Sequence, residues 1–190
     1  MSTGAIIAII IGVVVLLIIA FIWGSYNSLV RLNERVNEAW SDITVQLKYR
    51  ADLIPNLVET VKGYAKHEKS AFEDVTKARS AVMSAKSVDG VAQAEKSLEG
   101  ALSKVFAIAE SYPELKANEN FKELQIQLQD TEDKIQAARR FYNNGAKELN
   151  AKIKMFPINL FHGFGFKVRE YYNVDAAEAK KIENAPEVKF

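Results

Sequence analysis

Two histidines and a set of carboxylates are the residues of this chain that could carry chemistry. His67 and His162 are its only histidines, and neither has a second ligand at the spacing that metal sites use, such as His-Glu-x-x-His. Glu68 follows His67 directly, but adjacent residues on a helix do not face each other. We therefore interpret both histidines as surface or turn residues.

Other kinds of reaction centre lack their characteristic residues. The chain has no cysteine, which excludes disulfides, thiolate metal sites and a cysteine nucleophile. It contains no Glu-x-x-His pair of a di-iron bundle, no Walker loop and no Gly-x-Ser-x-Gly elbow. Gly163-x-Gly165 alone does not indicate nucleotide binding. We predict a protein that is not an enzyme and that uses no cofactor and no metal.

The N-terminal segment, to which the rest of the chain is attached, is apolar. No side-chain charge occurs in the first thirty residues, and Ala5 to Trp23 is an unbroken apolar run. A helix of about 19 residues at ~1.5 Å per residue spans roughly 28 Å, which matches the bilayer hydrocarbon. Because a basic n-region and a small-residue cleavage site are missing, a retained span is favoured over a signal peptide. We assign a short tail to residues 1–4 and a transmembrane helix to 5–25, with Trp23 and Tyr26 at the membrane interface.

Few charges indicate which side of the membrane holds the body. Arg31 and Arg35 follow the span, and no basic residue precedes it. Cytoplasmic flanks carry the excess of Lys and Arg, so the pattern favours a cytoplasmic body over an extracytoplasmic one. A folded domain can also cross the membrane regardless of flanking charge, which keeps the second orientation open.

The body after the span has the pattern of helices. The formal net charge of the chain is +1, with acidic and basic residues interspersed, which argues against a nucleic-acid binder. Prolines and glycines are few, and apolar residues repeat at three- and four-residue steps. We predict an all-α fold in which the transmembrane helix continues into an extended antiparallel four-helix bundle over residues 26–158. The fourth apolar stripe starts at Phe121 and has coiled-coil regularity until Pro157 closes it.

Breaks in the apolar pattern divide the body into its helices. The first body helix contains Pro55, where we expect a kink. A second helix is expected over roughly residues 70–84. Ser87 or Asp89 is expected to cap the third helix, which should stop before Pro113 because a proline pushes its predecessor out of the helical conformation.

The C-terminal part of the chain, residues 159–190, follows no long helical stripe. It is aromatic and glycine-rich around Phe161, Phe164 and Phe166. One interpretation is that this segment folds back and caps the bundle. The other is that it touches the membrane or a second copy, because exposed aromatic residues usually mark an interface. Residues 176–190 are expected to add a short amphipathic turn and a loose end.

Charged residues lie beside two of the apolar stripes. The first body helix carries Arg50, Asp52 and Glu59, and the fourth carries Glu132 and Arg139. We favour the interpretation that these residues form interhelical ion pairs that fix the register of the helices. The alternative is a groove that binds a partner.

Several blocks of this sequence resemble one known family. The longest is QLKYRADLIPNLVETVKGYA, from Gln46 to Ala65. The shorter blocks are Tyr26–Val30, Ala39–Ile43, His67–Glu68, Tyr112–Asn118, Phe121, Thr131–Glu132, Ala138–Arg140, Tyr142–Asn143 and Phe156–Pro157. With these blocks, which reach from the span to about residue 172, the chain is similar to the LemA family of bacterial membrane proteins.

The resemblance implies a short N-terminal tail, one transmembrane helix and an antiparallel helical bundle in the bacterial cell envelope. It brings no catalytic residues, because the family has none established. Relatives include proteins of magnetosome membranes, which implies by analogy a membrane-shaping or scaffolding role. Some relatives have lipoprotein-type leaders that place the body outside the cytoplasm. This chain lacks the cysteine of such a leader, so the side of the membrane does not carry over.

We predict a non-catalytic scaffold, anchored in the bacterial inner membrane, that self-associates because confinement to a plane raises the effective concentration of chains. The alternative is an adaptor or sensor that presents the bundle to a protease or signalling protein. The expected partners are the lipid bilayer, further copies of the chain or an unidentified envelope protein, and not nucleic acid. The predicted interaction residues are Trp40, Asp52, Pro55, Asn56, Glu59, Phe161, Phe164 and Phe166.

Overall fold

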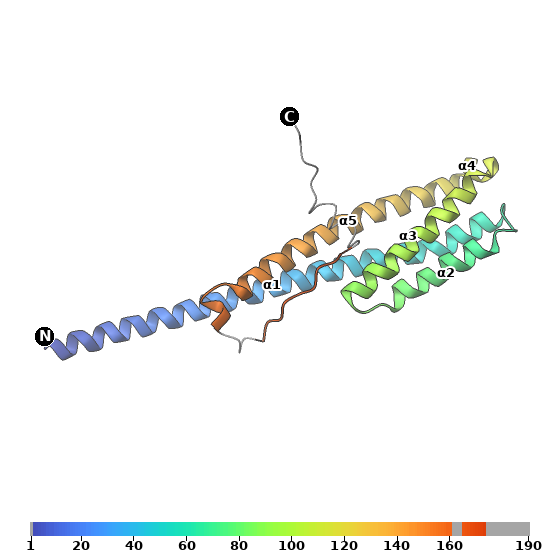
Figure 1. The fold of residues 1–190 in the computed structure, drawn as a ribbon. Coiled ribbons are helices and arrows are strands. Elements are labelled where there is room, and N and C mark those ends of the chain that lie inside the picture. The colour runs from blue at the N-terminus through green and yellow to red at the C-terminus, as the bar shows by residue number, and fades with distance from the viewer. Residues whose placement is uncertain (1, 161–164, 174–190) are drawn as a thin grey trace, which may run out of the picture.

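The computed structural model describes residues 2–160 and 165–173, and in these residues the secondary structure is helical (Figure 1). The predictions made for Phe161, Phe164 and residues 176–190 lie outside the described residues. The elements are α1 (Thr3–Lys62), α2 (Lys69–Ser84), α3 (Val88–Glu110), α4 (Pro113–Ala117), α5 (Glu119–Lys154) and the 3-10 turn η1 (Ile158–Leu160).

Helix α1 joins the apolar span to the first body helix without a break, as predicted. Its N-terminal part is buried nowhere, and within the described ranges α1 is the one helix long and apolar enough to cross a bilayer. From Ser25 onward, buried residues recur mostly every third or fourth position, which is the stripe of an amphipathic helix. The helix continues through Pro55, which is exposed.

Helices α1 and α5 run antiparallel along the length of the body (Figure 1). The ion pair between Arg35 and Glu148, 3.3 Å long, joins their membrane-proximal parts. A Cβ added to Gly145 would lie 3.2 Å from Cγ2 of Val36. The small residues Gly145 and Ala146, both buried, therefore allow the two backbones to approach closely.

Helices α2 and α3 form a hairpin against the part of α1 and α5 far from the N-terminus (Figure 1). Their buried residues belong to the same hydrophobic core as those of α1 and α5. Ser87 caps α3 by accepting a hydrogen bond from the backbone N–H of Gly90 at 3.1 Å, which is one of the two caps expected. The described residues thus confirm an all-α fold in which the apolar helix continues into antiparallel helices.

Two boundaries differ from the sequence expectations. The short helix α4 separates α3 from α5, and Asn118 after it caps α5 by accepting from the N–H of Phe121 at 3.0 Å. At its other end α5 stops at Lys154, before Pro157. The backbone of Met155 is already extended, with ψ of 140°, so Phe156 leaves the buried stripe on which we expected it and is 78% exposed.

The close approach of α1 and α5 gives a first testable expectation. Gly145→Leu should lower the free energy of unfolding by about 1–3 kcal/mol, because extra atoms in a close-packed contact force the helices apart. Gly100→Leu on α3 is the matched control, since a Cβ there meets nothing within 4 Å, and removing a helical glycine stabilises by about 0.5–1 kcal/mol. Denaturant unfolding followed by circular dichroism measures both. Equal effects of the two substitutions would contradict the close approach.

Candidate functional site

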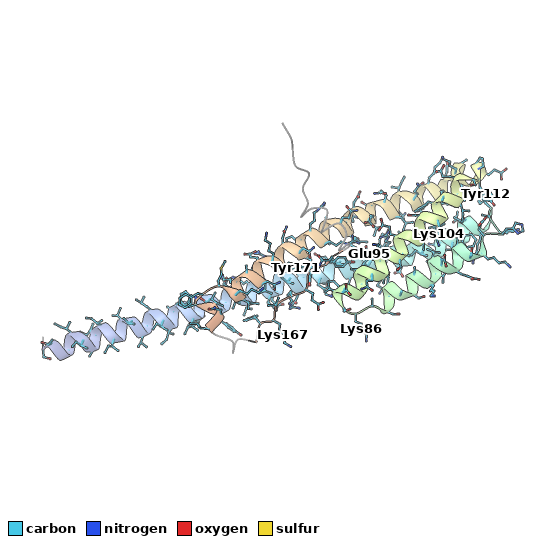
Figure 2. All side chains as sticks on the ribbon, in the orientation of Figure 1. Lys86, Glu95, Lys104, Tyr112, Lys167 and Tyr171 are labelled. Atoms are coloured by element: carbon cyan, nitrogen blue, oxygen red, sulfur yellow. The ribbon has the colours of Figure 1, made fainter. Side chains whose placement is uncertain are left out.

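One buried carboxylate lies at the centre of the polar contacts in the body. Glu95 on α3 is 2% exposed and lies on the buried stripe between Ala92 and Leu98. Figure 2 shows it where α3 faces α1 and α5. Because a charge without water is costly unless it is paired and hydrogen-bonded, Glu95 requires partners from the neighbouring helices.

Two arginines compensate the charge of Glu95. Nη1 of Arg50 on α1 lies 3.5 Å from Oε1 of Glu95 and donates to Oε2 of Glu132 on α5 at 2.6 Å. Arg139 on α5 forms an ion pair with the same Oε1 of Glu95. Two arginines and two glutamates therefore connect α1, α3 and α5 with balanced charge. The interhelical ion pairs predicted for Arg50, Glu132 and Arg139 are confirmed.

The last member of this group comes from the C-terminal segment. Tyr172 is 2% exposed, and its hydroxyl donates to Oε2 of Glu95. The guanidinium carbon of Arg139 lies 5.0 Å from the centre of the Tyr172 ring. We call Arg50, Glu95, Glu132, Arg139 and Tyr172 the Glu95 cluster.

The electrostatics of the Glu95 cluster raise the pKa of two of its donors, Tyr172 and Arg139. Burial raises the pKa of Tyr172 far above its ordinary value of 10.0, and the charge and hydrogen bond of Glu95 raise it further. Burial by itself lowers the pKa of Arg139, but the hydrogen bond and charge of Glu95 outweigh burial and leave that pKa raised. The tyrosine hydroxyl and the guanidinium therefore stay hydrogen-bond donors to Glu95.

The segment that carries Tyr172, residues 165–173, has no regular secondary structure and runs along the body beside α1 and α5 (Figure 1). Side chains of α5 hold its backbone. The side-chain amide of Asn150 donates to the carbonyl of Arg169 at 2.8 Å and accepts from its N–H at 2.7 Å. Asn143 makes the same pair of bonds with Tyr172, at 3.0 and 2.8 Å. Two asparagines thus satisfy the backbone of an extended peptide.

Side chains of α1 complete the surroundings of this segment. One guanidinium nitrogen of Arg169 donates to the side-chain oxygens of Asn33 and Asn37, both at 2.8 Å. The ring of Trp40 lies 6.4 Å from that of Tyr172. Trp40, which we predicted as an interaction residue, therefore lies beside Tyr172. We call the surface of α1 and α5 that binds residues 165–173, with Asn33, Asn37, Asn143 and Asn150, the groove.

The start of the segment packs near the membrane end of the body. The ring of Phe166 lies 5.8 Å from the ring of Tyr26, and Phe166 is partly buried against the core. Phe166 therefore folds back against the body, and the alternative of a membrane or second-copy contact stays a prediction.

The other predicted interaction residues of α1 lie on its exposed side. Asp52 is 3.7 Å from Arg79 of α2, an interhelical pair of the predicted kind. Pro55 and Asn56 are exposed. Glu59 is exposed as well and has no ion pair within residues 2–160 and 165–173, in contrast to the interhelical pair we expected for it.

Sequence reasoning missed several residues of this site, namely Glu95, Asn150 and Tyr172 as well as Asn33, Asn37 and Arg169. Glu95 had a recognisable signal, because it is a glutamate at a stripe position of an amphipathic helix, three residues from each of two buried apolar neighbours. Asn150 and Tyr172 had none, since the recognition of an extended segment by helix side chains leaves no periodicity in the sequence.

The chemistry that this arrangement supports is recognition of a peptide. The buried charges are paired with one another, and among the described residues no group of three or more histidines and carboxylates could hold a metal ion. The amides of Asn143 and Asn150 use their donors and acceptors on the backbone of residues 165–173.

Comparison with known proteins decides the family. A sequence model of the LemA family matches residues 39–190. The chain belongs to the LemA family. The matched part contains α2, α3, α5 and the C-terminal segment, and so all members of the Glu95 cluster. Family membership and the apolar part of α1 together describe a membrane-associated helical protein.

The chain is similar to a protein LemA and to magnetosome proteins named MamQ. Protein LemA of Metamycoplasma hominis is 29% identical over 165 residues, which cover 84% of this chain and 72% of the relative. Magnetosome protein MamQ of Magnetospirillum gryphiswaldense is 27% identical over 175 residues, and magnetosome protein MamQ 1 of Paramagnetospirillum magneticum is 26% identical over 174. The aligned regions cover 64% of the length of each magnetosome relative.

The buried carboxylate gives a second expectation. Glu95→Gln should lower the free energy of unfolding by about 3–5 kcal/mol, because removal of one partner leaves buried positive charge uncompensated. The matched control is Glu99→Gln, one turn further along α3 and exposed, which should leave the unfolding midpoint unchanged. Both are measured by denaturant unfolding in the same detergent. A Glu95→Gln chain as stable as the control would show that the Glu95 cluster does not hold the body together.

Proposed function

We propose that this LemA family protein is a non-catalytic scaffold, anchored in the bacterial inner membrane, that self-associates in the membrane plane. Helix α1 carries the proposal, because one helix runs from the apolar span into the core of the body. From Trp23 to Lys62 it extends roughly 58 Å at ~1.5 Å per residue. The body is therefore a rod fixed to its anchor, and neighbouring rods meet side by side.

Confinement to a plane makes weak lateral contacts sufficient for assembly. Linked or co-confined binding partners have an effective concentration far above their bulk concentration. The rod exposes large apolar side chains along the middle of α1 and α5, namely Val45 (58%), Tyr49 (47%) and Phe141 (52%). Burial of such residues against a second rod would stabilise the pair by roughly 25 cal/mol per Å² of apolar surface.

The magnetosome relatives support the same role by analogy. Their names place them in magnetosomes, and we extend to this chain only a membrane-organising function. The flanking Arg31 and Arg35 favour a cytoplasmic body. Together with the paired charges of the Glu95 cluster, these observations favour a protein that organises others over one that converts a substrate.

A basic hollow supports a second candidate function, that of an adaptor. At the end of the body far from the N-terminus, a hollow is lined by Phe72, by Glu73 and by four lysines, which are Lys62, Lys66, Lys69 and Lys77. A basic surface with an apolar floor fits an acidic protein partner. An adaptor that presents this end to a protease or signalling protein would use it.

Particle size separates the two candidates. The full chain in mild detergent, measured by light scattering and electron microscopy, should form a large and uniform particle. Phe141→Glu should shrink that particle, because it puts a charge into an apolar contact. Gln125→Glu adds the same charge at another exposed position of α5 and should leave the size unchanged. A monomeric parent chain would refute the scaffold and favour the adaptor.

A further inference from the structure

The two asparagines that hold residues 165–173 are spaced to bind an extended backbone. Asn143 and Asn150 are seven residues apart on α5, which is about 10.5 Å along a helix. The residues that they bind, Arg169 and Tyr172, are three residues apart, which is about 10 Å along an extended chain. Each asparagine both donates to and accepts from its target. The spacing of the two asparagines thus matches the spacing of the two residues that they bind. Because Asn150 binds Arg169 and Asn143 binds Tyr172, the segment runs antiparallel to α5.

The groove binds two side chains of the segment in addition to its backbone. The hydroxyl of Tyr172 reaches Glu95, and the guanidinium of Arg169 binds Asn33 and Asn37 on α1. Tyr171 remains 43% exposed. The groove therefore selects an extended peptide with arginine at one position and tyrosine three residues later.

All of these hydrogen bonds join parts of the chain that are far apart in sequence. The nearest pair in sequence, Asn150 and Arg169, is 19 residues apart, and the Arg169–Asn33 contact spans 136. The contacts are those of a docked peptide, because the segment has no helix or ladder of its own. An identical segment from another molecule would make the same contacts.

We propose that this groove is a peptide-binding site whose ligand in the assembly is the segment 165–173 of a second copy, exchanged between neighbouring rods. The proposal rests on the self-association proposed above and adds a second contact to the lateral apolar one. Exchange replaces each contact within a chain by the same contact between chains, so it costs little beyond the ordering of the pair. Confinement in the membrane supplies the high effective concentration that favours the linked form.

Direct binding tests the groove. A fluorescent peptide of residues 165–173 is added to full-length chains whose own segment is weakened, either by Tyr172→Ala or by Arg169→Ala, and its polarisation is measured. The peptide should bind, and adding Asn143→Ala and Asn150→Ala to either chain should weaken binding at least about tenfold, because four hydrogen bonds are lost. Adding Asn144→Ala, an exposed neighbour on α5, should change nothing. No binding to either weakened chain would overturn the peptide site.

The peptide itself supplies matched controls. A peptide with Tyr171→Ala should bind like the parent peptide, since that side chain is largely exposed. A peptide with Tyr172→Ala should lose binding, because it cannot reach Glu95. Equal binding of the two peptides would show that the groove does not select the tyrosine.

Mixing two full-length variants tests the exchange between copies. One chain has a defective groove, Asn143→Ala with Asn150→Ala, and the other has a defective segment, Tyr172→Ala. Each alone should form smaller particles than the parent. When the two variants are co-expressed with different tags, capture of one should retain the other, because the intact segment of the first fits the intact groove of the second, whereas two differently tagged copies of the groove-defective chain should retain each other less. Parent-sized particles from either variant alone, or no gain in capture for the complementary pair, would overturn the exchange while the scaffold stands. A monomeric parent would instead overturn the scaffold itself.

Discussion

A carboxylate that is removed from water must find positive charge and hydrogen-bond donors, and the rest of this structure depends on how Glu95 finds them. Its partners come from α1, α5 and the C-terminal segment, through Arg50, Arg139 and Tyr172. An apolar residue at position 95 would pack against any register of the helices. With a glutamate there, only the register that brings both arginines and the tyrosine into contact with the carboxylate is stable. The hydrophobic core supplies the bulk of the stability, and the Glu95 cluster selects one arrangement of the core.

The Glu95 cluster also affects how the body is oriented relative to the apolar span. Because α1 is continuous from the apolar span into the core, whatever fixes the register of the body also fixes the body relative to the bilayer. The segment 165–173 is tied to the same cluster at Tyr172 and to the membrane end of the body at Phe166. In the planar assembly that we propose, the docked segment links copies and the rigid anchor orients them.

The sequence predicts those parts of the protein that depend on periodicity. The continuity of α1, the Ser87 cap and the end of α3 before Pro113 follow from apolar spacing and local backbone chemistry. The ion pairs of Arg50, Glu132 and Arg139 were foreseeable as charges beside apolar stripes, although their shared partner Glu95 was not recognised. The end of α5 ahead of Pro157 follows the same local rule as the end of α3 before Pro113, although we expected Phe156 to stay on the stripe. The docking of residues 165–173 was not predictable, because it depends on tertiary contacts. Asn150 looks like any polar residue of a helix until its peptide is in place.

Hydrogen exchange at two backbone amides tests most directly whether the Glu95 cluster holds the segment. The amides of Arg169 and Tyr172 donate to Asn150 and Asn143, so they should exchange slowly in the full-length protein. Tyr172→Phe removes only the hydroxyl that binds Glu95, and it should make both amides exchange fast while the amides of α1 and α5 stay protected. Tyr171→Phe should exchange like the parent. Fast exchange at both amides in the parent, or unchanged protection in Tyr172→Phe, would contradict the account.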